Sequence, residues 1–160
     1  MIGVFATTSF QEATILPKTE SMMVTLRKLD APDDAIKRTG IKELGTFGKN
    51  AEKAVPELKR FCGSLNLSYA VVETLRKIGT PNTAKLLIEI IKTDTNPVLS
   101  RTFAISGLKT VYNELDEPLQ RRAIETLEAA FLHGNPDVSN VAEKALTELN
   151  INVNSLLEKC

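Results

Sequence analysis

Tryptophan is absent from this 160-residue sequence, and aromatic residues make up only 5% of it. Packing must therefore come from leucine, isoleucine, valine and alanine, and such an aliphatic core suits helices that pack at close range. The sequence also lacks a stretch of about 20 apolar residues, which a membrane-spanning helix would need. Its apolar run at 86–88 ends at Glu89, and its N-terminal residues lack the positively charged start of a signal peptide. We therefore expect a cytoplasmic protein without a membrane anchor.

The sequence has no excess charge of either sign, since 20 lysines and arginines balance 20 aspartates and glutamates. Proteins that bind nucleic acids usually carry a basic excess, because neutralisation of phosphates supplies much of their affinity. The balance therefore argues against nucleic acid as a partner. It leaves a homo-oligomer open, because copies of a protein without net charge repel one another little.

Histidine and cysteine, which often build metal or nucleophilic sites, are scarce. The two cysteines, Cys62 and Cys160, form no CxxC motif and predict no disulfide framework, which fits a reducing compartment. Cys62 follows Phe61 on the expected buried face of a helix, so we expect a buried thiol. His133 stands near the end of a predicted helix, where its ring can interact with free carbonyl groups. We expect no metal, no cofactor and no catalytic residue, and therefore not an enzyme.

Helix starts recur along the chain as a capping residue directly before proline. Thr80, Asn96 and Asn135 each precede a proline. Threonine and asparagine side chains accept a hydrogen bond from the first free amides of a helix, and proline at the first helical position leaves no N–H unpaired. The carboxylate pairs at 33–34 and 116–117 also stand at expected helix starts, where negative charge complements the helix dipole. We interpret these pairs as caps rather than as acid–base groups.

Between these starts, apolar residues are spaced by three and four positions, as on one face of an α-helix. No segment shows the alternation typical of a strand. A helix at about 17–29 is expected to cover the core of the first helix pair, whereas residues 1–13 give no clear signal. One leucine of each pair takes an equivalent place, at intervals of roughly 30 to 40 residues: Leu44, Leu75, Leu108 and Leu146. The expected buried stripes include Ile36, Gly40 and Phe47; Ala51, Val55, Leu58 and Cys62; Val71 and Ile78; Ala84, Leu87 and Ile91; Ala104, Val111 and Leu115; Ala123, Leu127 and Ala130; Val138, Ala142, Ala145 and Leu149.

The stretch from Gly79 to Leu108 resembles a HEAT repeat. The residues that carry the resemblance are Gly79-Thr80-Pro81, the helix from Ala84 to Ile91, Asp94, Pro97, Val98, Arg101, Ala104 and Leu108. The pattern is similar to the short HEAT-like repeats of phycobilisome lyase-type proteins. The resemblance covers about residues 30–150 and implies an all-α fold, a right-handed α–α superhelix of about four helix pairs with a capping N-terminal helix. It also implies an ion pair between Asp94 and Arg101 that ties neighbouring repeats together.

We expect a single HEAT-like repeat domain over residues 1–160. It divides into an N-terminal segment with its cap helix and four repeat units, the last of which ends in a short helix. The expected ranges are 1–29 for the N-terminal segment and 30–64, 65–95, 96–134 and 135–160 for the units.

The resemblance implies a protein-binding scaffold or adaptor rather than a shared chemistry. In HEAT-like arrays the second helix of each pair lines the concave face, and a rotation of about 100° per residue gives its outward positions. These positions mix both charge signs, which favours a protein or peptide partner over a polyanion. Ile88 and Leu132 point partly outward and would serve as apolar anchors if exposed. The expected partner-binding residues are Lys53, Glu57, Arg60, Lys85, Ile88, Glu89, Lys92, Arg121, Arg122, Glu125 and Glu128.

Two other functions stay open at this point. A helper protein resembling the bilin lyases would need a cavity for a tetrapyrrole and a partner subunit. A nucleic-acid-binding protein resembling the HEAT-like DNA glycosylases would need a basic groove and stacking aromatic residues. The neutral charge and the absence of tryptophan count against the second of these.

Overall fold

The computed structural model describes residues 18–159, and all regular structure in that range is helical. None of the helices in that part of the chain is long and apolar enough to cross a membrane. The α-helices are α2 (Lys18–Lys28), α3 (Asp34–Thr46), α4 (Val55–Lys59), α5 (Ser68–Ile78), α6 (Pro81–Lys92), α7 (Val98–Val111), α8 (Glu117–His133), α9 (Pro136–Glu148) and α10 (Asn154–Leu157). Two 3-10 helices, η1 (Gly48–Ala54) and η2 (Tyr112–Glu114), precede α4 and α8.

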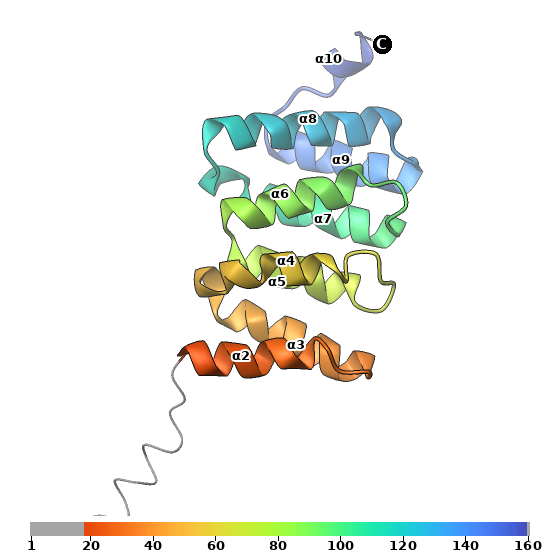
Figure 1. Cartoon of the computed structure of the whole chain (residues 1–160). Helices are drawn as coiled ribbons and strands as arrows, with labels where there is room; N and C mark the ends of the chain where they lie inside the picture. Colours follow the sequence, from red (N-terminus) through yellow and green to blue (C-terminus); the bar gives the residue numbers. More distant parts are fainter. Residues whose placement is uncertain (1–17, 160) are drawn as a thin grey trace, which may run out of the picture.

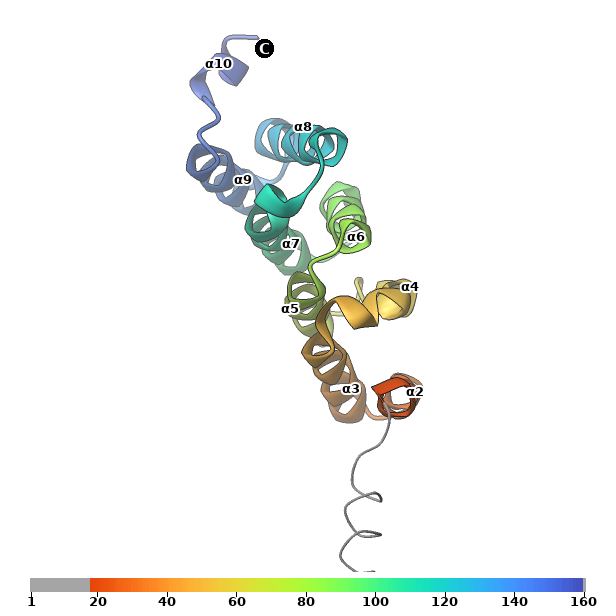
Figure 2. The same cartoon turned by 90° about the vertical axis from the view of Figure 1, so that its left-hand side faces the viewer.

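The helices stack in two layers, and the described chain ends lie at opposite ends of the stack (Figure 1). Figure 2 shows α3, α5, α7 and α9 in one layer, which we call the first-helix layer, and α2, α4, α6 and α8 in the other, the second-helix layer. Most contacts between helices join neighbours along the stack, such as α5 and α7, or partners across the layers, such as α6 and α7. The fold is therefore an α–α solenoid, as the sequence predicted. The handedness of the superhelix and the residue limits of its units stay predictions.

An aliphatic core lies between the layers. The four leucines at equivalent places, Leu44, Leu75, Leu108 and Leu146, are all 0% exposed. Burial of each such side chain contributes roughly 1.5–3 kcal/mol. The expected burial of Ile36 is wrong, since its side chain is 45% exposed. Ile36 lies in the first turn of α3, which extends past the core, and the buried part of that helix begins one turn later.

Polar side chains cap three of the helices as the sequence predicted. Asp33, Asp116 and Asn135 accept hydrogen bonds from free amides in the first turns of α3, α8 and α9, at 2.7, 3.0 and 2.9 Å. Thr80 precedes α6, but its side chain makes no capping hydrogen bond. The prediction that Asn96 starts α7 is wrong, because Pro97 occupies the capping position.

Asn96 instead helps to close the preceding helix. The last carbonyl groups of a helix have no partner within it. At the end of α6, the Asn96 side chain donates to the Ile90 carbonyl (3.2 Å) and Arg101 Nε donates to the Ile91 carbonyl (2.9 Å). Arg101 Nη2 also pairs with Asp94 Oδ1 at 2.9 Å, which confirms the expected ion pair. Arg101 thus joins the end of α6 to the start of α7.

The second helix of the first pair is not the continuous α-helix that the sequence predicted. Gly48, with a φ of 54°, leads from α3 into the 3-10 helix η1, and α4 has only five residues. Pro56 lies in the first turn of α4, where a residue without an N–H is tolerated, whereas in a helix interior it would remove a hydrogen bond and clash with the preceding turn. The proline therefore makes the α-helix begin at Val55. The expected stripe of this segment is nevertheless buried.

A glycine allows α2 to pack closely on α3. A Cβ atom added at Gly40 would lie 2.8 Å from Lys28 Cβ and 3.2 Å from the Thr25 carbonyl oxygen. The contact is reinforced by Glu43, which pairs with Lys28 Nζ at 2.7 Å. The expected helix near 17–29 is thus present as α2, and the expectation for residues 1–13 lies outside the described residues.

Candidate functional site

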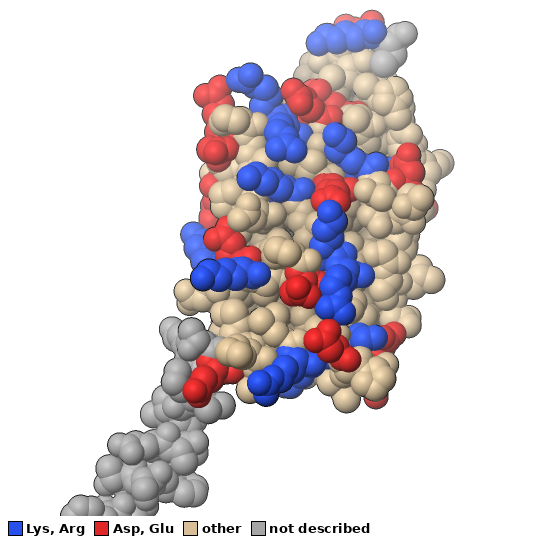
Figure 3. Space-filling model, in the orientation of Figure 1, with Lys and Arg blue, Asp and Glu red and all other residues tan. Residues whose placement is uncertain are grey.

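The charged residues expected to bind a partner lie on η1–α4, at Arg60 directly after α4, and on α6 and α8 of the second-helix layer. We call the outer surface of that layer the second-helix face. Figure 3 shows lysine and arginine interspersed with aspartate and glutamate over this side of the molecule. Of the expected set, the residues that are exposed or half-buried are Lys53, Glu57, Arg60, Lys85, Glu89, Lys92, Arg121, Arg122, Glu125 and Glu128. The concavity of this face stays a prediction.

The two expected apolar anchors are not exposed. Ile88 is only 3% exposed, so its expected exposure is wrong. The reason is that α6 lies between α4 and α8 in its layer and packs on α5 and α7 beneath, which buries most of its circumference. Leu132 is half-buried and packs against the core. The rotation angle of a residue around its own helix does not show whether a neighbouring helix covers it. Ile88 and Leu132 were therefore predicted to lie too far outward.

Several charges on the second-helix face are already paired. Arg60 contacts Glu57 at 2.9 Å and Asp30 at 3.2 Å, and these hydrogen bonds, Glu57 first, raise the pKa of its guanidinium group. Lys59 Nζ lies 2.6 Å from Glu89 Oε1, and this hydrogen bond raises the pKa of Lys59. Because these groups are exposed, each pair contributes little to stability. Its main effect is to neutralise charges that would otherwise be available to a partner.

Other cations on this face are free. Within residues 18–159, no ion-pair partner is found for Lys53, Lys85, Lys92 or Arg122. Lys53 and Lys85 border the space between η1–α4 and α6, and Lys92 and Arg122 border a smaller hollow between α6 and α8. Both sides of α6 therefore carry cations that a partner can reach.

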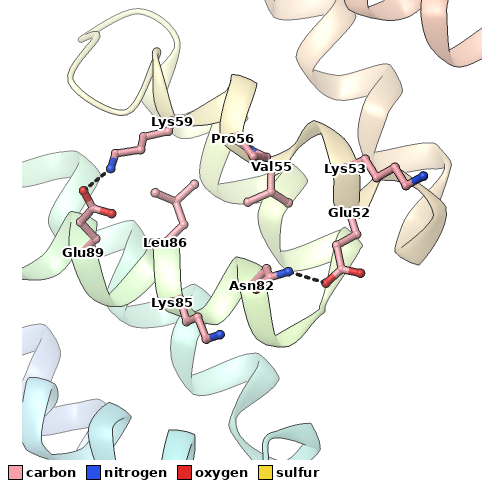
Figure 4. Close-up of a pocket in the computed structure, with 9 residues that line it drawn as sticks. All are labelled: Glu52, Lys53, Val55, Pro56, Lys59, Asn82, Lys85, Leu86 and Glu89. Carbon is pink, nitrogen blue, oxygen red and sulfur yellow. Dashed lines mark hydrogen bonds and ion pairs between the residues drawn. The ribbon is translucent and has the colours of Figure 1, made fainter.

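A groove of about 560 Å³ separates η1–α4 from α6, and we call it the α4–α6 groove. Its apolar side chains are Val55 and Pro56 on α4 and Leu86 on α6 (Figure 4). Two polar bridges cross it from wall to wall. One is the Lys59–Glu89 pair, and the other is a hydrogen bond of 2.9 Å from Asn82 Nδ2 to Glu52 Oε1. The volume falls in the range of about 300–1,000 Å³ that is typical of binding pockets.

Sequence reasoning placed Lys53, Lys85 and Glu89 on this surface but missed the rest of the groove. The α6 wall could have been predicted from helical spacing, because positions 82, 85, 86 and 89 fall on one side of a helix. The opposite wall could not be derived in this way, since it combines a 3-10 and a short α-helix whose rotations per residue differ. The lining residues that were not predicted are Glu52, Val55, Pro56, Lys59, Asn82 and Leu86.

Cys62 is a buried thiol, as predicted. It is 7% exposed, and its Sγ lies 3.7 Å from the Leu58 carbonyl oxygen. Burial raises the pKa of the Cys62 thiol to about 12, with a smaller contribution from the charge of Glu89. A nucleophilic cysteine needs a lowered pKa and access to solvent, so this thiol has the properties of a core residue.

His133 is the last residue of α8 and is exposed. The helix is closed by the backbone N–H of Gly134, which donates to the Ala130 carbonyl. In the described part of the chain, the His133 ring makes no hydrogen bond with the free carbonyl groups that it was expected to contact. The same part of the chain contains no group of three His, Cys, Asp or Glu side chains that could hold a metal ion.

Comparison with known protein families places part of the chain among helical repeats. The sequence model of the family described as HEAT repeats matches residues 23–109, which cover α3 to α6 together with most of α2 and α7. No curated protein matches the chain.

Proposed function

Because the chain belongs to the HEAT-repeat family, whose folds are generally non-catalytic scaffolds, we propose that it is a scaffold or adaptor that binds another protein on its second-helix face. The observation that carries the proposal is the contrast between the buried apolar side and the exposed charged side of α6. The aliphatic side chains of this helix belong to the buried core, whereas Lys85, Glu89 and Lys92 are exposed to solvent. Exposed charges of both signs on a rigid support select a partner of complementary charge pattern.

The charge pattern also favours a protein partner over nucleic acid. Binding along a phosphate backbone requires a positively charged groove that follows the strand, with aromatic residues on which bases stack. On the second-helix face, carboxylates such as Glu89 and Glu125 interrupt the cations. The exposed aromatic side chain of Tyr69, which packs against Phe103 at 4.7 Å between ring centres, belongs to the first-helix layer.

The proposal is tested by quantitative affinity capture from the cells that produce the protein. We compare the wild type with the triple variant Lys85→Ala/Glu89→Ala/Lys92→Ala. A matched control, Glu73→Ala/Arg76→Ala/Lys144→Ala, removes the same charges from the first-helix layer. We expect at least one protein to be recovered equally by the wild type and the control and about tenfold less by the triple variant, which corresponds to about 1.4 kcal/mol of binding free energy.

Thermal unfolding of all three proteins shows whether the substitutions leave the fold intact. If every captured protein is recovered equally by the two variants, the second-helix face is not the binding surface and the proposal fails.

A further inference from the structure

We propose that the α4–α6 groove binds a short peptide segment in which an aspartate or glutamate stands next to an aliphatic side chain. The inference rests on the proposed function and deepens it, because it names the chemistry of the segment that the second-helix face recognises.

The polar groups of the groove determine the charge of its occupant. Glu89 pairs with Lys59 at 2.6 Å, whereas Glu52 accepts a hydrogen bond of 2.9 Å from the neutral Asn82 amide and keeps its negative charge. In the described part of the chain, the ammonium groups of Lys53 and Lys85, one on each wall, have no ion-pair partner. The three lysines and two glutamates that line the groove leave one positive charge in excess, which favours a carboxylate over an ammonium group at its rim.

The apolar side chains between the two bridges determine the second feature of the occupant. Val55 and Leu86 are 5% and 6% exposed, and Pro56 is exposed beside them. Figure 4 shows these side chains between the Lys59–Glu89 and Asn82–Glu52 bridges. An aliphatic side chain would rest mainly on Pro56, since Val55 and Leu86 add only their edges to the surface, while a neighbouring carboxylate reaches a lysine at the rim. Apolar contact in the centre with charge at the rim is the usual arrangement of protein–protein interfaces.

The same bridges make a polyanion a poor fit. A phosphate backbone carries a charge on every nucleotide, and a strand that follows the groove would pass the carboxylates of Glu52 and Glu89 at its rim. A peptide can place one carboxylate near Lys85 and turn uncharged groups toward these glutamates. The alternation of charges in the groove therefore fits a peptide with a single acidic residue better than a nucleic acid.

The test uses a phage-displayed library of random dodecapeptides, selected on the wild type and on Lys53→Glu/Lys85→Glu. We expect wild-type selections to be enriched in Asp or Glu next to Leu, Ile or Val, and the variant to select Lys or Arg at the same place. Synthetic copies of the wild-type peptides should bind the variant at least about tenfold more weakly, or about 1.4 kcal/mol. Lys53→Arg/Lys85→Arg and the first-helix control Lys42→Glu/Lys144→Glu should bind them within about threefold of the wild type.

Other outcomes overturn the inference in distinguishable ways. Peptides that lose affinity only in Lys92→Glu/Arg122→Glu would place the site beyond α6 and leave the proposed function standing. Peptides that bind every variant of the second-helix face equally would remove both proposals. The groove is not a site for acidic peptides if the selection yields no acidic peptide whose binding depends on Lys53 and Lys85. The same conclusion follows if a fluorescent single-stranded DNA binds through these two lysines and the peptides do not.

Discussion

Arg101 shows how a single side chain joins two helix pairs. Its Nε atom donates to the free Ile91 carbonyl, while its partner Asp94 is 87% exposed. We expect Arg101→Met to lower the free energy of unfolding by about 2–3 kcal/mol, because a hydrogen bond from a charged group to the end of α6 is lost. Asp94→Asn should cost less than about 1 kcal/mol, because the pair is open to solvent on that side. Urea unfolding measures both, and equal losses would show that the ion pair rather than the carbonyl contact stabilises the junction.

Cys62 gives a residue-scale prediction with a defined pH window. Its pKa in the folded protein, about 12, is above the ordinary value of 9.0, so the folded state holds the proton more tightly than the unfolded state. This stabilisation is complete below pH 9 and is lost as the pH rises toward 12, by about 1 kcal/mol over the first pH unit. The comparison is between Cys160→Ser and Cys62→Ala/Cys160→Ser, with the free energy of unfolding measured from pH 8 to pH 11. This free energy should fall more steeply in the protein that keeps Cys62. Parallel curves would contradict the burial of the thiol.

At the scale of elements, the attachment of α2 depends on Gly40. The Cβ position of this glycine lies 2.8 Å from Lys28 Cβ, so Gly40→Val must push α2 away from α3. We expect a loss of about 1–3 kcal/mol, typical of overpacking. Hydrogen exchange should quicken in residues 18–28 and change little in α6. Gly63→Ala is the control, because a Cβ atom there meets only Asn96 Oδ1, at an ordinary contact distance of 3.7 Å. Slow hydrogen exchange of α2 in Gly40→Val would disprove the tight contact.

The elements also show how far sequence patterns reach. The spacing of apolar residues predicted the helices and the leucines buried between the layers, because one amphipathic face suffices to locate a core. It failed for Ile88, whose burial comes from helices on either side of α6, and for the η1–α4 segment, where Pro56 interrupts a pattern that otherwise looks continuous. The bridges that define the α4–α6 groove join side chains 30 positions apart, between Lys59 and Glu89 and between Glu52 and Asn82. Spacing within one helix contains no information about such pairs.

The molecule as a whole is a linear array in which contacts are made mainly between neighbouring helices. Stability in such arrays is approximately a sum of local contributions. We expect Leu146→Ala in α9 to cost about 2–5 kcal/mol and to quicken hydrogen exchange in α8, α9 and α10, while α3 stays protected. Leu75→Ala, at an equivalent buried place in the middle of the stack, should expose both halves. Uniform loss of protection across the chain in Leu146→Ala would instead indicate a single cooperative globule.

The short α4 has a mechanical consequence for the same array. Together with η1, its five residues form one side of a seam whose other side is the 12-residue α6. Beneath this seam α5 contacts both η1 and α6, so a shift of either wall of the groove is transmitted to α5. The width of the α4–α6 groove is thereby coupled to the packing of α5 in the first-helix layer.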